Sequence, residues 1–85
     1  MVTKQTVAGK IAAYLRHDIS LVELVSWAED AMMNGDFAED ETSTIAAVVA
    51  RLGVADVRAF GLAWEDCEQL LGQLGYAARV DIVAA

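Results

Sequence analysis

The segment of residues 30 to 41, DAMMNGDFAEDE, has the residue types and part of the spacing of a twelve-residue calcium loop. Oxygen-bearing side chains and a glycine occupy its first, fifth, sixth and twelfth positions: Asp30, Asn34, Gly35 and Glu41. The third position holds a methionine and the ninth an alanine, and neither side chain offers a hard cation an oxygen ligand. A divalent-ion-binding helix-loop-helix over residues 30 to 41 is therefore an alternative function. Our main interpretation of the sequence includes no metal and no other cofactor.

One histidine and one cysteine are the side chains that titrate nearest neutral pH. Cys67 falls between Trp64 and Leu71 on an apolar helical stripe, which favours a small buried thiol. His17 is expected at the end of a helix, where an imidazole can bind backbone carbonyls. The chain contains no phosphate-binding loop, no Cys or His metal spacing and no nucleotide fingerprint. We therefore predict that the protein is not an enzyme.

Residues 45 to 62, IAAVVARLGVADVRAFGL, place a glycine after an apolar helix and then a valine and a second short segment. This order resembles the helix-turn-helix of bacterial repressors, which implies a second helix that reads DNA. The second segment offers only Arg58 as a basic side chain, contains Asp56 and is interrupted by Gly61. A small DNA-associated regulator is accordingly an alternative function.

Negative charge is concentrated in the middle of the chain, since residues 18 to 50 contain eight Asp or Glu and no Lys or Arg. Residues 1 to 17 carry a net charge of +3, and residues 51 to 85 carry -2. The acids expected on one surface lie on one helix and in the turn after it: Glu29, Asp30, Asp36, Glu39, Asp40 and Glu41. Trp27 lies off the main apolar stripe, and an exposed Trp is a favoured interface anchor, although a wide buried face would also accommodate it.

Two interpretations of this acidic block compete: a solvated surface that keeps a small domain soluble, and a surface complementary to a basic partner. We predict a small acidic protein-protein interaction module that binds an unidentified, basic protein. Its size, acidity and helicity suit a bacterial inhibitor of a basic toxin or nuclease, such as an antitoxin or an immunity protein. The formal charge of -7 argues against nucleic acid and acidic membrane surfaces as partners.

The 85 residues are enough for one acidic helical domain, residues 1 to 85, in which folding buries roughly 60 to 65% of the surface. With 56% hydrophobic residues, a modest core needs no disulfide, and a single cysteine gives no sign of secretion. The longest uncharged stretch, 69 to 78, is about half of the ~20 residues that a membrane helix needs. We expect a cytoplasmic protein.

Apolar periodicity predicts a mainly α fold, a compact bundle of four helices over about 4–17, 21–34, 37–52 and 63–74. Ser20 and Glu23 have the spacing of a capping box that starts the second helix, and a left-handed Gly35 would end it. Asp36 and Glu39 repeat the capping-box spacing before the third helix. Glycine is expected to end the last two helices in Schellman motifs, at residues 53 and 75.

The predicted core contains Leu24, Val25, Val48, Val49 and Leu71, and Met32 continues the apolar line of the second helix. After the helices, residues 76–83 alternate between apolar and other side chains, which predicts a short C-terminal strand. A lone strand leaves its backbone unpaired, so this one requires either residues 54–60 or the same strand of a second chain. The protein is therefore expected to be a monomer or a homodimer formed through this strand.

Overall fold

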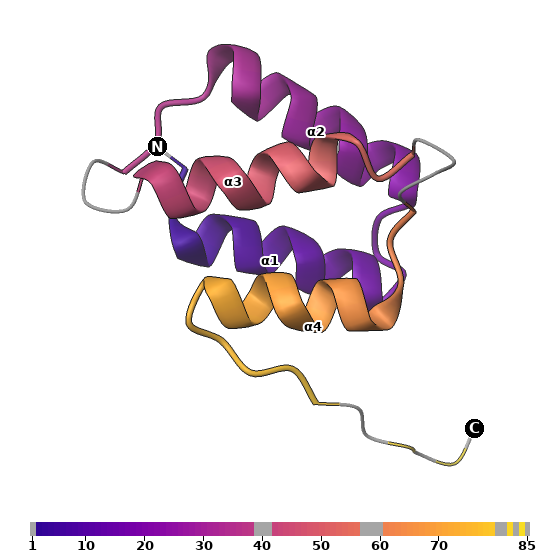
Figure 1. Ribbon diagram of the computed structural model, residues 1–85. Helices are drawn as coiled ribbons and strands as arrows, with labels where there is room; N and C mark the ends of the chain where they lie inside the picture. Colours follow the sequence, from indigo (N-terminus) through magenta and orange to yellow (C-terminus); the bar gives the residue numbers. More distant parts are fainter. Residues whose placement is uncertain (1, 39–41, 57–60, 80–81, 83, 85) are drawn as a thin grey trace.

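Four helices make up most of the part of the chain that the computed structural model describes, which is residues 2–38, 42–56, 61–79, 82 and 84. They are α1 (Lys4–Leu15), α2 (Leu21–Asn34), α3 (Thr42–Gly53) and α4 (Trp64–Gln73). Figure 1 shows α2 and α3 on one side of the bundle, α1 next to them, and α4 beyond α1. The prediction of a mainly α bundle of four helices is confirmed.

The second helix begins and ends where its sequence predicts. The Ser20 backbone N–H donates to Glu23 Oε1 at 3.2 Å, and the Glu23 N–H donates to Ser20 Oγ at 3.1 Å. This reciprocal pair is a complete capping box, which satisfies two amide donors that the first turn leaves free. A local signal of this kind needs no tertiary contact, and α2 accordingly starts at Leu21 as expected.

Gly35 ends α2 by a mechanism different from the predicted one. Its φ of -73° and ψ of 146° are extended, so the expected left-handed conformation is wrong. Its N–H still donates to the Ala31 carbonyl at 2.8 Å, which brings the two backbones close together. A Cβ on residue 35 would collide with that carbonyl oxygen, so glycine is required for space rather than for positive φ.

Two helices end in the same hydrogen-bond pattern with different residues at the left-handed position. At the end of α1, His17 has φ of 64°, and the Asp18 N–H donates to the Ala13 carbonyl at 2.9 Å. At the end of α4, Gly75 has φ of 89°, and the Tyr76 N–H donates to the Leu71 carbonyl at 2.9 Å. Both ends are Schellman motifs, which confirms the prediction at residue 75 and explains why α1 ends at residue 15 rather than 17.

The third helix is described from Thr42, and its predicted start at residue 37 is wrong because residues 37 and 38 pair with Val2 instead. Val2 and Phe37 form a parallel β-bridge, in which the Val2 N–H donates to the Asp36 carbonyl at 2.6 Å. The Ala38 N–H donates back to the Val2 carbonyl at 3.0 Å. Asp36 is therefore not a helix cap, and its predicted capping partner at residue 39 lies outside the described residues.

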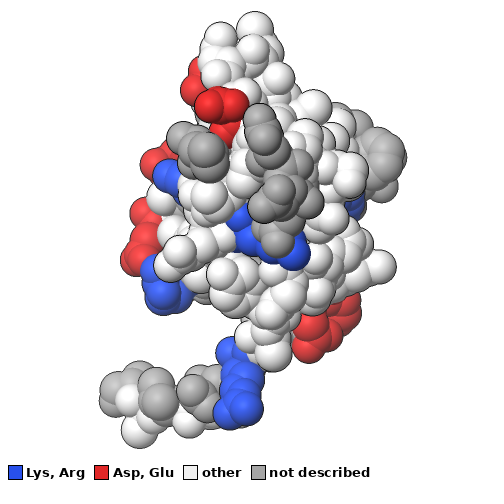
Figure 2. Space-filling view, turned by 90° about the vertical axis from the view of Figure 1, so that its left-hand side faces the viewer, with Lys and Arg blue, Asp and Glu red and all other residues white. Residues whose placement is uncertain are grey.

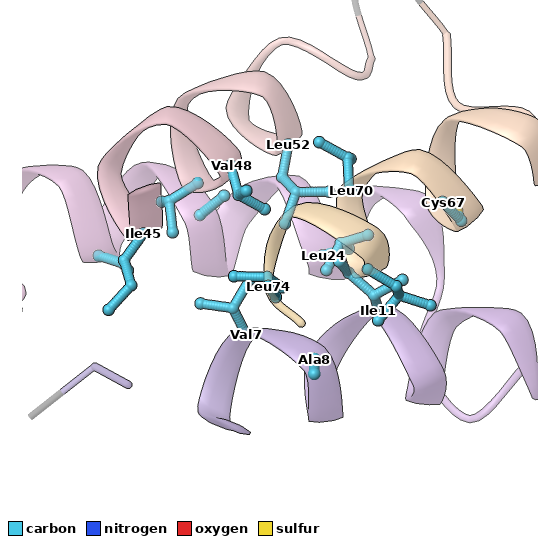
Figure 3. Close-up of a cluster of buried hydrophobic side chains, with 14 residues drawn as sticks. Val7, Ala8, Ile11, Leu24, Ile45, Val48, Leu52, Cys67, Leu70 and Leu74 are labelled. Carbon is cyan, nitrogen blue, oxygen red and sulfur yellow. The ribbon is translucent and has the colours of Figure 1, made fainter. Parts of the chain in front are cut away.

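The core lies between all four helices, whose apolar side chains point into the same space in Figure 3. All five predicted core residues are buried. Met32 is 47% exposed, so its assignment to the core is wrong: it lies in the last turn of α2, which rises away from α3 (Figure 1). Gly53 is the last residue of α3 and has no positive φ, so the predicted Schellman motif there is also wrong.

The start of α4 is held by Arg51, which lies in the last turn of α3. Its Nη2 donates to the Gly61 carbonyl at 3.0 Å and lies 3.6 Å from Asp66 Oδ2. The same Asp66 oxygen accepts the Ala63 N–H at 2.9 Å. Because Ala63 has no side chain that can cap a helix, these contacts replace the missing cap and join α4 to α3.

The C-terminal segment does not form the predicted strand 76–83 in its described residues, 76–79 and 82. No part of the described chain offers a neighbouring strand, since residues 54–56 form a turn and 57–60 lie outside the described residues. An unpaired segment gains no ladder hydrogen bonds, and its alternating pattern alone does not fix a strand. Residues 76–79 run past α4 at the edge of the bundle (Figure 1), where Ala78 is half-buried against the core, and Ile82 is 95% exposed.

Candidate interaction surfaces

The outer face of α2 is an apolar and acidic surface. Four of its side chains are exposed and recur at intervals of three or four residues, which places them in one line: Val22, Ser26, Glu29 and Met33. Val22 is 72% exposed and Met33 is 82% exposed. Asp30 and Glu23 lie beside this line, and α2 contains no Lys or Arg. We call these six residues the α2 face.

The structure brings together some of the acids that the sequence predicts on one surface. Glu29 and Asp30 lie on the α2 face, and Asp30 Oδ1 accepts a hydrogen bond from Asn34 Nδ2 at 3.1 Å. Asp36 is exposed just beyond the helix, and its backbone is held by the bridge to Val2. The other three predicted members, Glu39, Asp40 and Glu41, lie outside the described residues.

Trp27 lies at the edge of the α2 face rather than on it. Its side chain is half-buried and packs against the core, and Lys10 Nζ of α1 lies 5.7 Å from the ring centroid. A lysine at this distance over an aromatic ring makes a cation–π contact. One edge of Trp27 borders a shallow hollow that Val22, Ser26 and Asp30 also line. The tryptophan therefore joins the α2 face to α1 and is only partly available to a partner.

Charge on the side of the molecule shown in Figure 2 is divided into small groups. Asp and Glu side chains appear in separate clusters, with Lys and Arg side chains between them. Among the coloured and white atoms of this view, no continuous acidic surface extends from one end to the other. On this side of the molecule, the described acidic side chains therefore form local groups.

The calcium-loop spacing falls on a helix in its first part. Residues 30 to 34 belong to α2, whereas the first positions of such a loop are not helical. Within the described ranges, no three His, Cys, Asp or Glu side chains are grouped so that they could hold a metal ion. Glu41, at the twelfth position, lies outside those ranges.

The cysteine and the histidine have very different surroundings. Cys67 is fully buried, and burial, followed by the Asp66 carboxylate, raises the pKa of its thiol, while Arg51 acts in the opposite direction. A raised pKa disfavours the thiolate, which is the reactive form. His17 is exposed in its left-handed position at the end of α1.

The helix-turn-helix pattern over 45–62 is described only in part. Its first section belongs to α3, and Val54 to Asp56 form a turn. Residues 57 to 60, which include Arg58, lie outside the described residues. Gly61 follows with φ of 61°.

A second surface, which sequence reasoning missed, is a groove along α1 and α4. It has a volume of about 660 Å³. It is lined by one side of α1 from Gln5 to the capping residue Arg16, by Trp64 and Leu71 of α4, and by residues 76–79. Its aromatic and basic members are Trp64, Tyr76, Arg16 and Arg79. We call this site the α1/α4 groove. Its members come from α1 and from α4 with the segment after it, which lie far apart in the chain, so no spacing along the chain signals it.

Comparisons with protein families, with curated proteins and with solved structures found no match to this chain. None of the helices in the described part of the chain is long and apolar enough to cross a membrane. The physical character of the two surfaces therefore provides the basis for a functional assignment.

Proposed function

We propose that this protein is an acidic protein-binding module whose α2 face docks a basic partner protein. The observation that carries the proposal is the combination, on one exposed helix face, of Val22 and Met33 with Glu29 and Asp30. Side chains as large and apolar as Met33 gain free energy when a partner removes them from water. The carboxylates between them favour a partner with Lys or Arg opposite.

The two kinds of side chain have different consequences for binding kinetics. Exposed carboxylates act at long range, so they accelerate encounter with a basic surface and make the association rate depend on salt. Apolar contacts form only after docking, so Val22 and Met33 mainly set the dissociation rate. The line from Val22 to Met33 covers twelve residues, or about 16 Å of helix, which suits the centre of a small interface.

Within this function we favour an inhibitor of a basic toxin or nuclease. Such an inhibitor must recognise a surface that is rich in Lys and Arg, because the nucleic-acid substrate of the partner is an anion. A small acidic domain with no Lys or Arg on its binding helix satisfies that requirement. The α2 face would then occupy the position of the substrate's phosphates.

The decisive experiment compares two variants of equal charge. Glu29→Lys with Asp30→Lys changes the α2 face, and Asp56→Lys with Glu68→Lys makes the same change of charge at exposed positions elsewhere. Each bait is used for affinity capture from the native host, with quantitative mass spectrometry. We expect one basic protein to be captured by the parent and the control variant, and at least tenfold less by the α2 variant. Equal capture by both variants would overturn the proposal.

The contribution of the apolar side chains to binding is tested with the partner protein captured in the first experiment. Val22→Thr with Met33→Gln keeps the charge of the α2 face and removes apolar area. We expect faster dissociation with a nearly unchanged association rate, measured by surface plasmon resonance. The charge variant is expected to slow association instead. If neither rate constant responds to these changes, the partner binds elsewhere on the protein.

A further inference from the structure

We infer that the α1/α4 groove is a second docking surface, which takes an acidic amphipathic helix of a partner protein. This inference is independent of the function proposed for the α2 face. Figure 1 places α2 and α4 at opposite sides of the bundle, with α1 and α3 between them. One partner can therefore occupy the groove while another occupies the α2 face.

The dimensions of the groove match a short helix. It follows α1 from Gln5 to Arg16, about 16 Å at 1.5 Å per residue, which is three helical turns. Its volume of about 660 Å³ is open to solvent along this length rather than enclosed. Two helices and the segment after α4 form the walls of this trough. A third helix laid into such a trough is a common mode of peptide recognition.

The side chains in the groove are of the types that dominate binding energy in protein interfaces. Trp, Tyr and Arg are the residue types most enriched among such hot spots, and the groove contains two aromatic and two Arg side chains. Trp64 is half-buried and Tyr76 is 43% exposed, so both keep surface that a partner can cover. The remaining lining is mostly apolar and small, and it includes Ala8, Ala12 and Leu71.

The charges that line the groove indicate which kind of partner helix it binds. The chain has thirteen Asp and Glu residues, yet none of those in the described ranges lines the groove, whereas Arg16 and Arg79 both do. Arg16 has an ion pair with Asp18 at 3.2 Å, but both side chains are more than 60% exposed, and such pairs exchange readily. Two guanidinium groups and no carboxylate among the described lining residues favour an occupant that carries Asp or Glu.

The same charges argue against two other occupants. A symmetric dimer through this groove would bring Arg16 and Arg79 of both copies to one interface, where like charges repel. A lipid chain prefers an enclosed apolar cavity that covers most of its surface, which an open trough does not provide. An amphipathic helix with apolar side chains on one face and Asp or Glu at its edges fits the floor and the rim together.

The test begins with a phage-displayed library of helical 16-residue peptides, selected on the intact protein. We expect enrichment of peptides with apolar residues at i, i+3 or i+4, and i+7, flanked by Asp or Glu. The most enriched peptide is then synthesised with a fluorescent label, and its Kd is measured by anisotropy at two salt concentrations. Absence of enrichment, or enrichment of peptides with basic flanks, would overturn the inference.

Charge-matched variants locate the peptide on the protein. Arg16→Gln with Arg79→Gln removes two positive charges from the groove, and Gln69→Glu with Gln73→Glu changes the net charge equally at exposed positions of α4. We expect the first pair to weaken the Kd at least tenfold and the second pair by less than threefold. Equal weakening would mean that only the net charge of the protein matters.

Three further measurements distinguish peptide binding in the groove from binding at the α2 face and from binding of a lipid. Tyr76→Ala removes an exposed wall of the groove and leaves the core intact, so it should weaken peptide binding without lowering the melting temperature appreciably. The α2 variant with Glu29→Lys and Asp30→Lys should bind the peptide no more weakly than the parent. A failure of the groove inference can therefore be told apart from a failure of the function proposed for the α2 face.

Sodium dodecanoate is the probe for binding of a lipid in the groove. Saturable NMR shifts at Ala8 and Ala12 with tighter binding than the peptide would overturn the helix in favour of a lipid.

Discussion

The α2 face and the α1/α4 groove differ in charge, in shape and in how the chain builds them. The α2 face comes from one continuous helix, is convex and carries carboxylates. The α1/α4 groove comes from three segments, is concave and carries two guanidinium groups. A surface on one capped helix depends mainly on that helix, whereas a groove exists only while its walls are packed together. The two surfaces should therefore respond differently to changes confined to α4, which forms a wall of the groove alone.

The largest effect is expected from Leu24→Ala, since Leu24 of α2 is fully buried. Loss of its apolar area and the cavity left behind should cost about 2 to 5 kcal/mol of unfolding free energy, measured by urea melts. Both surfaces should weaken together, because a small domain has little stability to spare. Leu71→Ala, behind the groove, should cost less, about 2 kcal/mol at the lower end of this range, since water and neighbouring side chains can fill a cavity near the surface. Equal costs for the two variants would contradict the different packing of the two regions.

The next largest effect on the unfolding free energy is expected at the left-handed residues of the Schellman motifs that end α1 and α4. Gly75→Ala places a Cβ in a left-handed conformation and should lower the unfolding free energy by about 1 to 2 kcal/mol. It should also weaken occupancy of the groove, because Tyr76 and Arg79 follow directly. His17→Gly relieves the same strain in α1, with an expected gain of up to about 1 kcal/mol. Thermal melts of both variants check these opposite signs, and a loss for His17→Gly would mean that the imidazole makes a stabilising contact.

A smaller effect compares the beginnings of α2 and α4. Ser20→Ala removes the side-chain half of the capping box and should cost about 1 kcal/mol. Ala63→Ser supplies the hydroxyl that α4 lacks and should gain about 0.5 kcal/mol, because Asp66 already accepts the other bond. Urea melts of the two variants against the parent measure both values. A neutral Ser20→Ala would show that α2 is held by packing alone.

The smallest expected effect is a pH dependence of the unfolding free energy, which arises from Cys67 of α4. Burial raises the pKa of the Cys67 thiol in the folded protein, while in the unfolded chain a thiol ionises near pH 8.5. Above about that pH the unfolded chain binds fewer protons than the folded one, so the unfolding free energy falls as the pH rises toward the folded pKa. Cys67→Ala should remove this part of the slope between pH 8 and 10 in urea melts. An identical slope in parent and variant would show that the thiol does not contribute.

Sequence signals were reliable where they are local. The capping box at Ser20 fixes the start of α2, and the glycine at residue 75 fixes the end of α4, because each signal acts within a few residues. Predictions from the sequence were wrong where contacts between residues far apart in the chain decide the structure. The bridge between Val2 and Phe37 keeps residues 36–38 out of α3, and the alternation after residue 76 does not make a strand without a neighbour.

The same distinction applies to the candidate sites. The charge and exposure of Glu29 and Asp30 follow from helical spacing, so two of the six residues of the α2 face were predicted from the sequence. The sequence left open whether Trp27 is exposed or buried, because its half-buried position depends on packing against the core and on Lys10 of another helix. The α1/α4 groove is a property of tertiary packing, and the sequence showed only that Trp64 lies on an apolar stripe.

The bridge between Val2 and Phe37 has a dynamic consequence. It closes residues 2 to 37 into a loop that contains α1 and α2, while α4 is held by packing and by the contacts of Arg51. In native-state hydrogen exchange, the amides of α4 should therefore open at lower free energy than those of α2, as a separate cooperative unit. Because the groove exists only while α4 is docked, any occupant would slow exchange in α4 first. The order of amide protection can thus reveal occupancy of the groove before the occupant is identified.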